Sequence, residues 1–283
     1  MPELPEVEVL ARHLLPLLPG KRIRDVEVRR AKVVLPDAPA DFRSQLLGAT
    51  FLGLSRRGKN FLFELRRPRS RKTFILLGHL GMTGRIYLLR KGDALPKHAA
   101  VVLDLGRELF VYEDTRYFGR LTFDLSAIAA LGPEPLSEAF EPKIFGAALR
   151  RSGQAVKVKL LDQSLVAGVG NIYASEALFW AGISPLRAAD ALSAAQVKKL
   201  WQGVRSVLAE AIECGSTVPL NFAGGGSGGL FYFGLAPGVE DYYAERLRVY
   251  DRAGEPCVRC GRPIRRVVQA ARSTFFCPHC QRK

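Results

Sequence analysis

Cys257-Val258-Arg259-Cys260 and Cys277-Pro278-His279-Cys280 are two Cys-x2-Cys pairs, separated by sixteen residues near the end of the chain. Each pair suits a tight turn, and together they aim four thiolates at one tetrahedral ion. Two disulfides are the alternative, but most of the chain lacks cysteine and nothing at its start resembles a signal peptide. Four thiolates leave no open position for a substrate, so we expect one structural Zn2+ bound by Cys257, Cys260, Cys277 and Cys280.

Two other residues bear on this module. His279 lies inside the second pair and could replace a neighbouring cysteine as ligand, although we expect an ordinary turn residue there. Cys214, the fifth cysteine, lies near the end of a predicted helix and is expected to be a core or spectator residue.

The charge of the chain indicates a polyanionic partner. The formal net charge is +15 and the pI is about 9.9, and the segment from Cys257 onward holds seven Arg or Lys and no acid. Such an excess is typical of nucleic-acid binding. No apolar stretch is long enough to span a membrane, so a basic membrane-surface protein is the weaker alternative. The basic run 66–72 is interpreted, taken alone, as a solvated loop.

The hydrophobic pattern predicts about two domains in addition to the zinc module. Residues 3–18 carry a helical stripe, and a block of short strands follows from Ile23 to Phe123, which predicts a sandwich or barrel. From Pro142 to Gly215 the pattern is helical, and its clearest helix runs from Ser193 to Cys214. The predicted strands are 24–30, 51–55, 61–65, 73–77, 85–89, 100–105 and 109–112.

The first residues suggest covalent chemistry. Removal of Met1 would expose Pro2 as a secondary amine, which is partly free base at neutral pH and can form a Schiff base with electrophilic carbon. Glu3 and Glu6 are three residues apart, so on a helical turn they could share a face as proton donor and acceptor beside that amine. An ordinary helix start with proline and favourable acids is the alternative.

Three internal motifs remain open between a structural and a functional interpretation. Gly168-Val169-Gly170-Asn171 joins a glycine turn to a helix start, where Asn171 could cap the helix and the helix N-terminus could bind a phosphate. The segment 79–84, His-Leu-Gly-Met-Thr-Gly, predicts a turn after a strand. The segment 114–120 pairs Arg116 with Phe118, which suits insertion into a base stack but also fits a strand end with a buried Phe.

Taken together, these motifs resemble the bacterial formamidopyrimidine-DNA glycosylase family. The resemblance spans essentially the whole chain in family order. Leu4 favours this family over the endonuclease VIII branch, which usually reads Pro-Glu-Gly-Pro-Glu at its start. The motifs are the N-terminal Pro-Glu-Leu-Pro-Glu-Val-Glu, Arg57-Gly58-Lys59, the His-Leu-Gly-Met loop, the Asp-x-Arg-x-Phe-Gly loop, Gly-Val-Gly-Asn-Ile-Tyr and the four-cysteine finger.

The resemblance implies an α+β multidomain fold. Residues 1–130 would form a β-sandwich with the N-terminal helix, 131–246 a helix–two-turn–helix domain with the lesion loop, and 247–283 the zinc finger. It implies a monomeric, cytoplasmic bacterial enzyme that excises oxidised purines such as 8-oxoguanine and formamidopyrimidines from double-stranded DNA. Strand cleavage at the abasic site would follow by β,δ-elimination, in base excision repair.

The resemblance also assigns roles to single residues. Pro2 would attack C1′ of the flipped nucleotide, Glu3 would serve as acid/base, Glu6 would support the amine, and Lys59 would lie by the damaged site. Met82, Arg116 and Phe118 would fill the gap left by the flipped base. The residues implied to hold backbone phosphates are His79, Lys157, Asn171 and Arg272.

Some features depart from the family or leave alternatives open. The segment 216–247 is longer and richer in glycine than the usual loop over the damaged base, Asp251 replaces a usual Gly, and Ala271 stands where Gly is common. If Met1 remained, the Pro2 nitrogen would be an amide and could not react. The alternatives are an endonuclease VIII-like enzyme for oxidised pyrimidines and a non-catalytic protein that binds damaged DNA.

Overall fold

The computed structural model describes residues 2–215 and 247–282, and the chain divides into two compact units. Within the described residues, unit 1 comprises Pro2 and residues 6–129, and unit 2 comprises residues 3–5, 130–215 and 247–282. Most of the glycine-rich segment, residues 216–246, lies outside the described residues, as does Met1.

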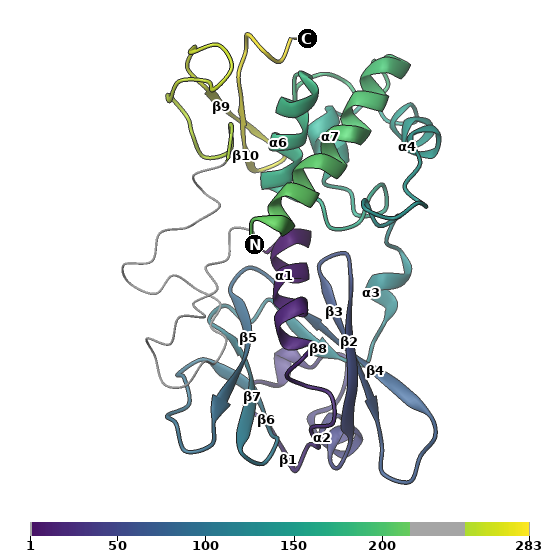
Figure 1. Ribbon diagram of the computed structural model, residues 1–283, viewed down its shortest axis with the longest axis vertical. Coiled ribbons are helices and arrows are strands. Elements are labelled where there is room, and N and C mark those ends of the chain that lie inside the picture. The colour runs from purple at the N-terminus through teal and green to yellow at the C-terminus, as the bar shows by residue number, and fades with distance from the viewer. Residues whose placement is uncertain (1, 216–246, 283) are drawn as a thin grey trace. The chain divides into compact units, whose positions relative to one another are not determined.

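Unit 1 is built from two four-stranded antiparallel sheets (Figure 1). One sheet has the strand order β1-β6-β7-β5 and the other β2-β3-β4-β8, and all seven predicted strands form with small shifts at their ends. The short β8 (Arg120–Thr122) was not predicted. The other strands are β1 (Asp25–Val28), β2 (Thr50–Arg57), β3 (Asn60–Arg66), β4 (Thr73–His79), β5 (Gly84–Arg90), β6 (Ala99–Asp104) and β7 (Glu108–Asp114).

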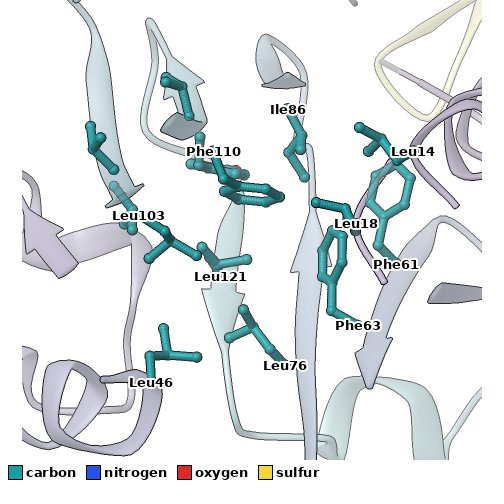
Figure 2. Close-up of a cluster of buried hydrophobic side chains, with 14 of the residues drawn as sticks. Leu14, Leu18, Leu46, Phe61, Phe63, Leu76, Ile86, Leu103, Phe110 and Leu121 are labelled. Carbon is teal, nitrogen blue, oxygen red and sulfur yellow. The ribbon is translucent and has the colours of Figure 1, made fainter. Parts of the chain in front are cut away.

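The core of unit 1 follows from the two periodicities of the sequence. Alternate residues of β3, among them Phe61 and Phe63, point into one buried cluster, as period-2 alternation requires. Helix α1 (Leu4–Leu14) contributes Leu14 to the same cluster, and Figure 2 shows Leu14 beside Phe61. The Phe63 and Phe110 rings meet edge to face at 5.5 Å, a geometry that adds to their burial energy.

The strand-like region also contains a helix that its hydrophobic pattern does not predict. Helix α2 (Pro39–Leu46) begins with proline in its first turn, a position where the missing N–H costs nothing. Phe42 and Leu46 lie four residues apart on its buried face. Its eight residues were too few for a clear 3.6-residue stripe. A short 3-10 turn (Ala31–Val33) and helix α3 (Ser126–Ala129) complete the unit.

Unit 2 contains the predicted helical region. Helix α7 (Ala194–Glu213) begins at Ser193 as expected, through a capping box with Gln196. Helix α6 (Asn171–Ala181) is buried on most of its surface, which explains why it carries no amphipathic stripe. It ends at Gly182, whose φ is +71°. The remaining helices are α4 (Pro142–Leu149) and α5 (Val156–Leu160).

The C-terminal module belongs to unit 2 and consists of a hairpin beside the cysteine turns. Strands β9 (Arg265–Gln269) and β10 (Arg272–Phe276) are joined by Ala270 and Ala271, with φ of +46° and +58°. Such a two-residue turn favours glycine or asparagine. Asp251 has φ of +60°. The two departures at Asp251 and Ala271 therefore lie where a glycine would fit without strain.

The buried Glu176 fixes the segment that leads into this module. From the middle of α6 its carboxylate accepts hydrogen bonds from the backbone N–H groups of Arg248, Val249 and Tyr250 at 2.8–2.9 Å. Burial raises the pKa of Glu176, and the three backbone donors oppose that shift. Within the described residues, no helix is both apolar and long enough to cross a bilayer.

Candidate active site and DNA-contact residues

The carboxylate of Glu3 lies at the N-terminus of helix α6. Its Oε1 accepts a hydrogen bond from the Ile172 N–H at 2.9 Å, and its Oε2 accepts one from the Tyr173 N–H at 3.3 Å. The side chain is 2% exposed. A helix N-terminus offers unpaired N–H groups and a positive dipole end, so it stabilises a negative charge placed there. Glu3, the residue that follows Pro2, is thereby held at the start of α6.

The glycine motif before α6 allows the N-terminal residues Glu3 and Leu4 to pack against it. Gly168 has φ of +84°, and its carbonyl accepts a hydrogen bond from the Leu4 N–H at 3.0 Å. A Cβ at Gly168 would collide with the Leu4 side chain, and one at Gly170 would collide with Glu3. The two glycines therefore leave room for Glu3 and Leu4. The two interpretations of this motif, a phosphate site and a helix cap by Asn171, both need correction.

The first correction is that Glu3 occupies the helix N-terminus expected to bind a phosphate. The second is that Asn171 does not cap the helix, because Gly170 is the N-cap residue and makes no side-chain cap. Glu3 itself precedes α1, so the helical spacing that predicted a shared face with Glu6 does not apply to this pair. Glu6 lies in the first turn of α1 and is buried.

Lys157 is the centre of a buried hydrogen-bond network in unit 2. Its ammonium donates to Asn171 Oδ1 at 2.6 Å, to the Ser273 carbonyl at 2.9 Å and to Thr274 Oγ1 at 2.7 Å. An ammonium has three donors, and all of them are used. Burial lowers the pKa of Lys157 to about 8, with Arg272 acting in the same direction and Glu3 opposing it.

The Lys157 side chain is buried, and its three donors all bond to protein groups. The phosphate contact expected of Lys157 stays a prediction. Asn171 reinforces the network by donating from Nδ2 to the Ser273 carbonyl at 3.0 Å. Both side chains thus hold strand β10 against α5 and α6. Arg272, the exposed residue next to Ser273, is positioned by them.

Lys59 lies in the tight turn between β2 and β3 of unit 1. Gly58 supplies the positive φ of this turn, +58°, and Lys59 is 7% exposed. Arg56 fixes the turn by donating to the Gly58 carbonyl at 2.9 Å and to Glu8 of α1 at 2.7 Å. Burial pushes the pKa of Glu8 upward, but Arg56 and Arg12 outweigh it and leave the pKa below its ordinary value. The ion pair therefore joins α1 to the turn that carries Lys59.

His79 ends strand β4, directly opposite Asn60 on β3. Its Nδ1 lies 3.1 Å from the Gly81 N–H and accepts a hydrogen bond from it. Burial, with Lys59 and Arg120 nearby, lowers the pKa of His79 to about 4. The ring is therefore neutral at physiological pH and carries its proton on Nε2. His79 can offer a phosphate an N–H donor without a charge.

The structure brings Met82, Arg116 and Phe118 together on two adjacent loops of unit 1. The Arg116 guanidinium lies 3.4 Å from the Met82 sulfur and 4.8 Å from the centre of the Phe118 ring. Met82 is 48% and Phe118 50% exposed, so the alternative of a buried Phe at a strand end is wrong. Arg116 thus contacts both exposed side chains, and the expected insertion of the three into a base stack stays a prediction.

The carboxylate of Asp114 fixes both loops through hydrogen bonds, a role that was not predicted. It is fully buried, and its Oδ1 accepts hydrogen bonds from Thr83 Oγ1 at 2.6 Å and from the Arg116 N–H at 3.1 Å. Its Oδ2 accepts from the Gly119 N–H at 2.8 Å. The signal was available, since Asp114 opens the Asp-x-Arg motif and aspartate commonly accepts from backbone N–H groups two residues on.

The four cysteines fit one zinc ion. Their sulfurs all lie within 4.8 Å of one another, with Cys257–Cys280 at 3.9 Å and Cys260–Cys277 at 3.5 Å. A zinc tetrahedron with Zn–S bonds of about 2.3 Å places its sulfurs about 3.8 Å apart. Backbone N–H groups also donate to the Cys257 and Cys277 sulfurs. His279 lies in a turn, as expected, and the cluster is made up of the four cysteines.

Three protein families match successive segments of the chain. Residues 1–121 match the formamidopyrimidine-DNA glycosylase N-terminal domain, 131–220 the H2TH domain of that glycosylase, and 254–282 the zinc finger found in FPG and IleRS. A formamidopyrimidine-DNA glycosylase of Symbiobacterium thermophilum is 44% identical over 293 residues, covering 99% of this chain and 89% of that protein.

Solved structures of the Lactococcus lactis enzyme share the fold. The enzyme non-covalently bound to AP-site DNA has a TM-score of 0.86 at 32% identity and covers 99% of this chain and all of that one. The wild-type enzyme with N7-benzyl-Fapy-dG DNA has a TM-score of 0.87 at 32% identity and covers both chains fully. The expected fold class and structural zinc site are confirmed. With full-length relatives at this identity, the chain belongs to the formamidopyrimidine-DNA glycosylase family.

Proposed function

We propose that this DNA glycosylase and AP lyase uses the amine of Pro2 as its nucleophile on oxidised purine lesions. The observation that carries the proposal is the fixed position of Glu3, which follows Pro2 and is held by two backbone N–H groups of α6. A carboxylate next to the amine can move protons during both steps of the reaction. Relatives bound to AP-site and Fapy-dG DNA support the substrate class.

In the first step the Pro2 nitrogen attacks C1′ of the extruded nucleotide, and the bond from C1′ to the base breaks. Glu3 supplies the proton that assists ring opening and loss of the base, and the product is an iminium ion. The iminium then acidifies C2′, so that β-elimination breaks the C3′–O bond and δ-elimination breaks the C5′–O bond. Glu6 supports the amine and later proton transfers, while Lys59 binds beside the lesion as a cation.

DNA contacts are proposed for two sets of residues. Met82, Arg116 and Phe118 fill the space that the flipped base leaves, which offsets an extrusion energy of a few kcal/mol. His79, Asn171 and Arg272 bind backbone phosphates, His79 as a neutral donor. Lys157 acts through Asn171 and Ser273. When bound, the zinc ion stabilises the module that carries Arg272 and takes no part in the chemistry.

We further infer that the protein works as a monomer in the bacterial cytoplasm, on nucleoid DNA. The proposed domain boundaries are 1–130, 131–246 and 247–283. The glycine-rich segment, to which base recognition was assigned, lies outside the described residues.

Borohydride trapping tests the nucleophile. Protein processed at Met1 should form a stable adduct with 8-oxoguanine or abasic duplex, and the adduct should map to the N-terminal peptide. The matched control is the same protein with Met1 retained, in which Pro2 is an amide and trapping should fall at least a thousandfold. Normal trapping and turnover by the Met1-retaining form would assign the reaction to another nucleophile.

A further inference from the structure

A second basic surface lies at the far end of the strands that carry Lys59 and His79. Strand β3 runs from Asn60, next to Lys59, to Arg66, and β4 returns from Thr73 to His79. The β3–β4 loop, residues 67–72, therefore lies at the end of this sheet opposite to Lys59 and His79. The direction of β3 can be followed in Figure 1. Six residue steps at about 3.3 Å each separate the two ends by roughly 20 Å. This distance exceeds the Debye length of about 8 Å at physiological salt, so exposed charges at the two ends are largely screened from one another.

Three segments distant in sequence build the second surface. Thr50 pairs with Arg66 on one side and with Arg22 on the other, so the two arginines flank it on neighbouring strands. Side chains directly opposite one another in a sheet point to the same face. At about 4.8 Å per strand, the Arg22 and Arg66 backbones are roughly 10 Å apart. The sheet thus presents two guanidinium groups side by side.

The β3–β4 loop adds more positive charge above this pair. The loop approaches the sheet closely at Gly48, whose φ is +79° and where a Cβ would lie 3.3 Å from the Pro68 ring. The resulting open hollow has a volume of about 260 Å³. Its main lining residues are Arg22, Thr50, Arg66, Arg67, Arg69 and Ser70.

These guanidinium groups are not neutralised by the protein. Across the described ranges 2–215 and 247–282, no ion pair involves any of the four arginines in the hollow, and none of its lining residues is acidic. Arg67 makes only long contacts with Gln45, at 3.4 Å. Arg69 has φ of +60°, a conformation that glycine would adopt with less strain. The turn alone does not account for an arginine at that position.

We propose that this arginine-lined hollow binds the phosphate backbone of a second DNA duplex. Guanidinium and hydroxyl groups commonly bind phosphates in proteins, and arginines whose backbones lie about 10 Å apart suit successive phosphates better than a single ion. Among the described residues lining the hollow there is no aromatic ring on which a base could stack, so binding is independent of sequence. The inference goes beyond excision: the protein can hold one duplex at its active site and take up another before it releases the first.

Competitor-dependent dissociation tests this surface. A labelled short duplex with an abasic analogue is bound first, and its dissociation rate is measured as unlabelled undamaged duplex is increased. We expect the rate to rise with competitor concentration, because the competitor enters a ternary complex. In the double variant Arg67→Ala/Arg69→Ala this acceleration should fall at least fivefold, and its salt slope should fall by about two units.

The matched control removes the same charge elsewhere. Arg150 and Arg151 are exposed at the end of α4, and Arg150→Ala/Arg151→Ala should keep the wild-type acceleration. Inorganic pyrophosphate replaces the competitor in a parallel series and should give no acceleration. A rate independent of duplex in the wild type, equal losses in the two double variants, or acceleration by pyrophosphate alone would overturn the proposal. Borohydride trapping by Arg67→Ala/Arg69→Ala should remain at the wild-type level, which separates this surface from the proposed catalysis.

Discussion

Three candidate residues of unit 2 make hydrogen bonds within the protein, whereas Met82, Arg116 and Phe118 on two loops of unit 1 are exposed. Glu3, Lys157 and Asn171 are held by hydrogen bonds to α6 and β10. Met82 and Phe118 are about half exposed, and Asp114 fixes their loops from behind. The contrast is one of packing: hydrogen bonds within unit 2 fix the Glu3 carboxylate and strand β10, whereas the two unit 1 loops expose their side chains to solvent.

The largest effect should follow from breaking the metal cluster in unit 2. Cys277→Ser removes one thiolate, and we expect loss of the bound zinc and a drop in DNA affinity of more than a hundredfold. Folding of such modules depends on their metal. Metal analysis of the wild type should find about one zinc per chain. The control is Cys214→Ser, which changes a cysteine outside the cluster at the end of α7.

The Cys277→Ser variant also tests whether the finger can unfold while unit 1 stays folded. Limited proteolysis of Cys277→Ser should cleave the segment after residue 246 while the fragment 6–129 stays protected. Metal-free protein with normal affinity would contradict the assignment of the finger as a DNA-binding element.

The next largest effect is expected from a change in the buried hydrogen-bond network around Lys157. Lys157→Met keeps the length of the side chain but removes three donors, so Asn171 Oδ1, the Ser273 carbonyl and Thr274 Oγ1 lose a partner. Each unsatisfied buried group costs about 1–3 kcal/mol, and we expect a loss of about 2–4 kcal/mol in the free energy of unfolding of unit 2. Denaturant titration measures it.

The matched control for that variant is Lys159→Met. Lys159 forms a more exposed ion pair with Asp162 at 2.7 Å, and pairs of this kind contribute about 0–1 kcal/mol. Equal destabilisation by the two variants would mean that Lys157 has no special structural role. If Lys157→Met keeps its stability but loses DNA affinity, the result would instead support a direct contact between Lys157 and a phosphate.

Smaller effects are expected from Phe118→Ala in the exposed loops of unit 1 and from Arg272→Ala in the finger, and the two should differ in kind. Phe118→Ala removes a stacking contact of about 1–3 kcal/mol and should impair excision of 8-oxoguanine from duplex, while cleavage at a pre-formed abasic site continues. Arg272→Ala should weaken both reactions together and lower the salt slope of binding by about one unit. Both reactions are measured for both variants at two salt concentrations. Equal losses on the two substrates for Phe118→Ala would contradict the expected insertion of Phe118 into the base stack.

The sequence predicted the elements of this fold better than it predicted their contacts. Strand alternation and the zinc spacing are local patterns, and they were correct because each depends on a few neighbouring residues. Helix α2 was missed because only Phe42 and Leu46 mark its buried face. The hydrogen bonds from Ile172 to Glu3 and from Lys157 to Thr274 could not be predicted, since each joins residues more than 100 positions apart along the chain. Asn171 fits a helix cap by type, but tertiary contacts with Lys157 and Ser273 use its side chain instead.

The smallest effect concerns the turn that precedes Arg272. Ala271 has φ of +58°, a conformation that costs a residue with a Cβ roughly 1–2 kcal/mol relative to its ordinary backbone. Ala271→Gly relieves this strain but also loosens the unfolded chain, so we expect a net gain of about 0.5–1 kcal/mol in the stability of the finger. Thermal unfolding of the zinc-bound protein measures the gain.

Ala253→Gly, at a position where φ is not positive, provides the control and should lower stability slightly. If the network of Lys157 and Asn171 positions Arg272, Ala271→Gly should leave DNA affinity within about twofold, because the bonds to Ser273 and Thr274 remain. A stabilised finger with much weaker binding would show instead that the strained turn positions Arg272, and the buried network would then lose its assigned role.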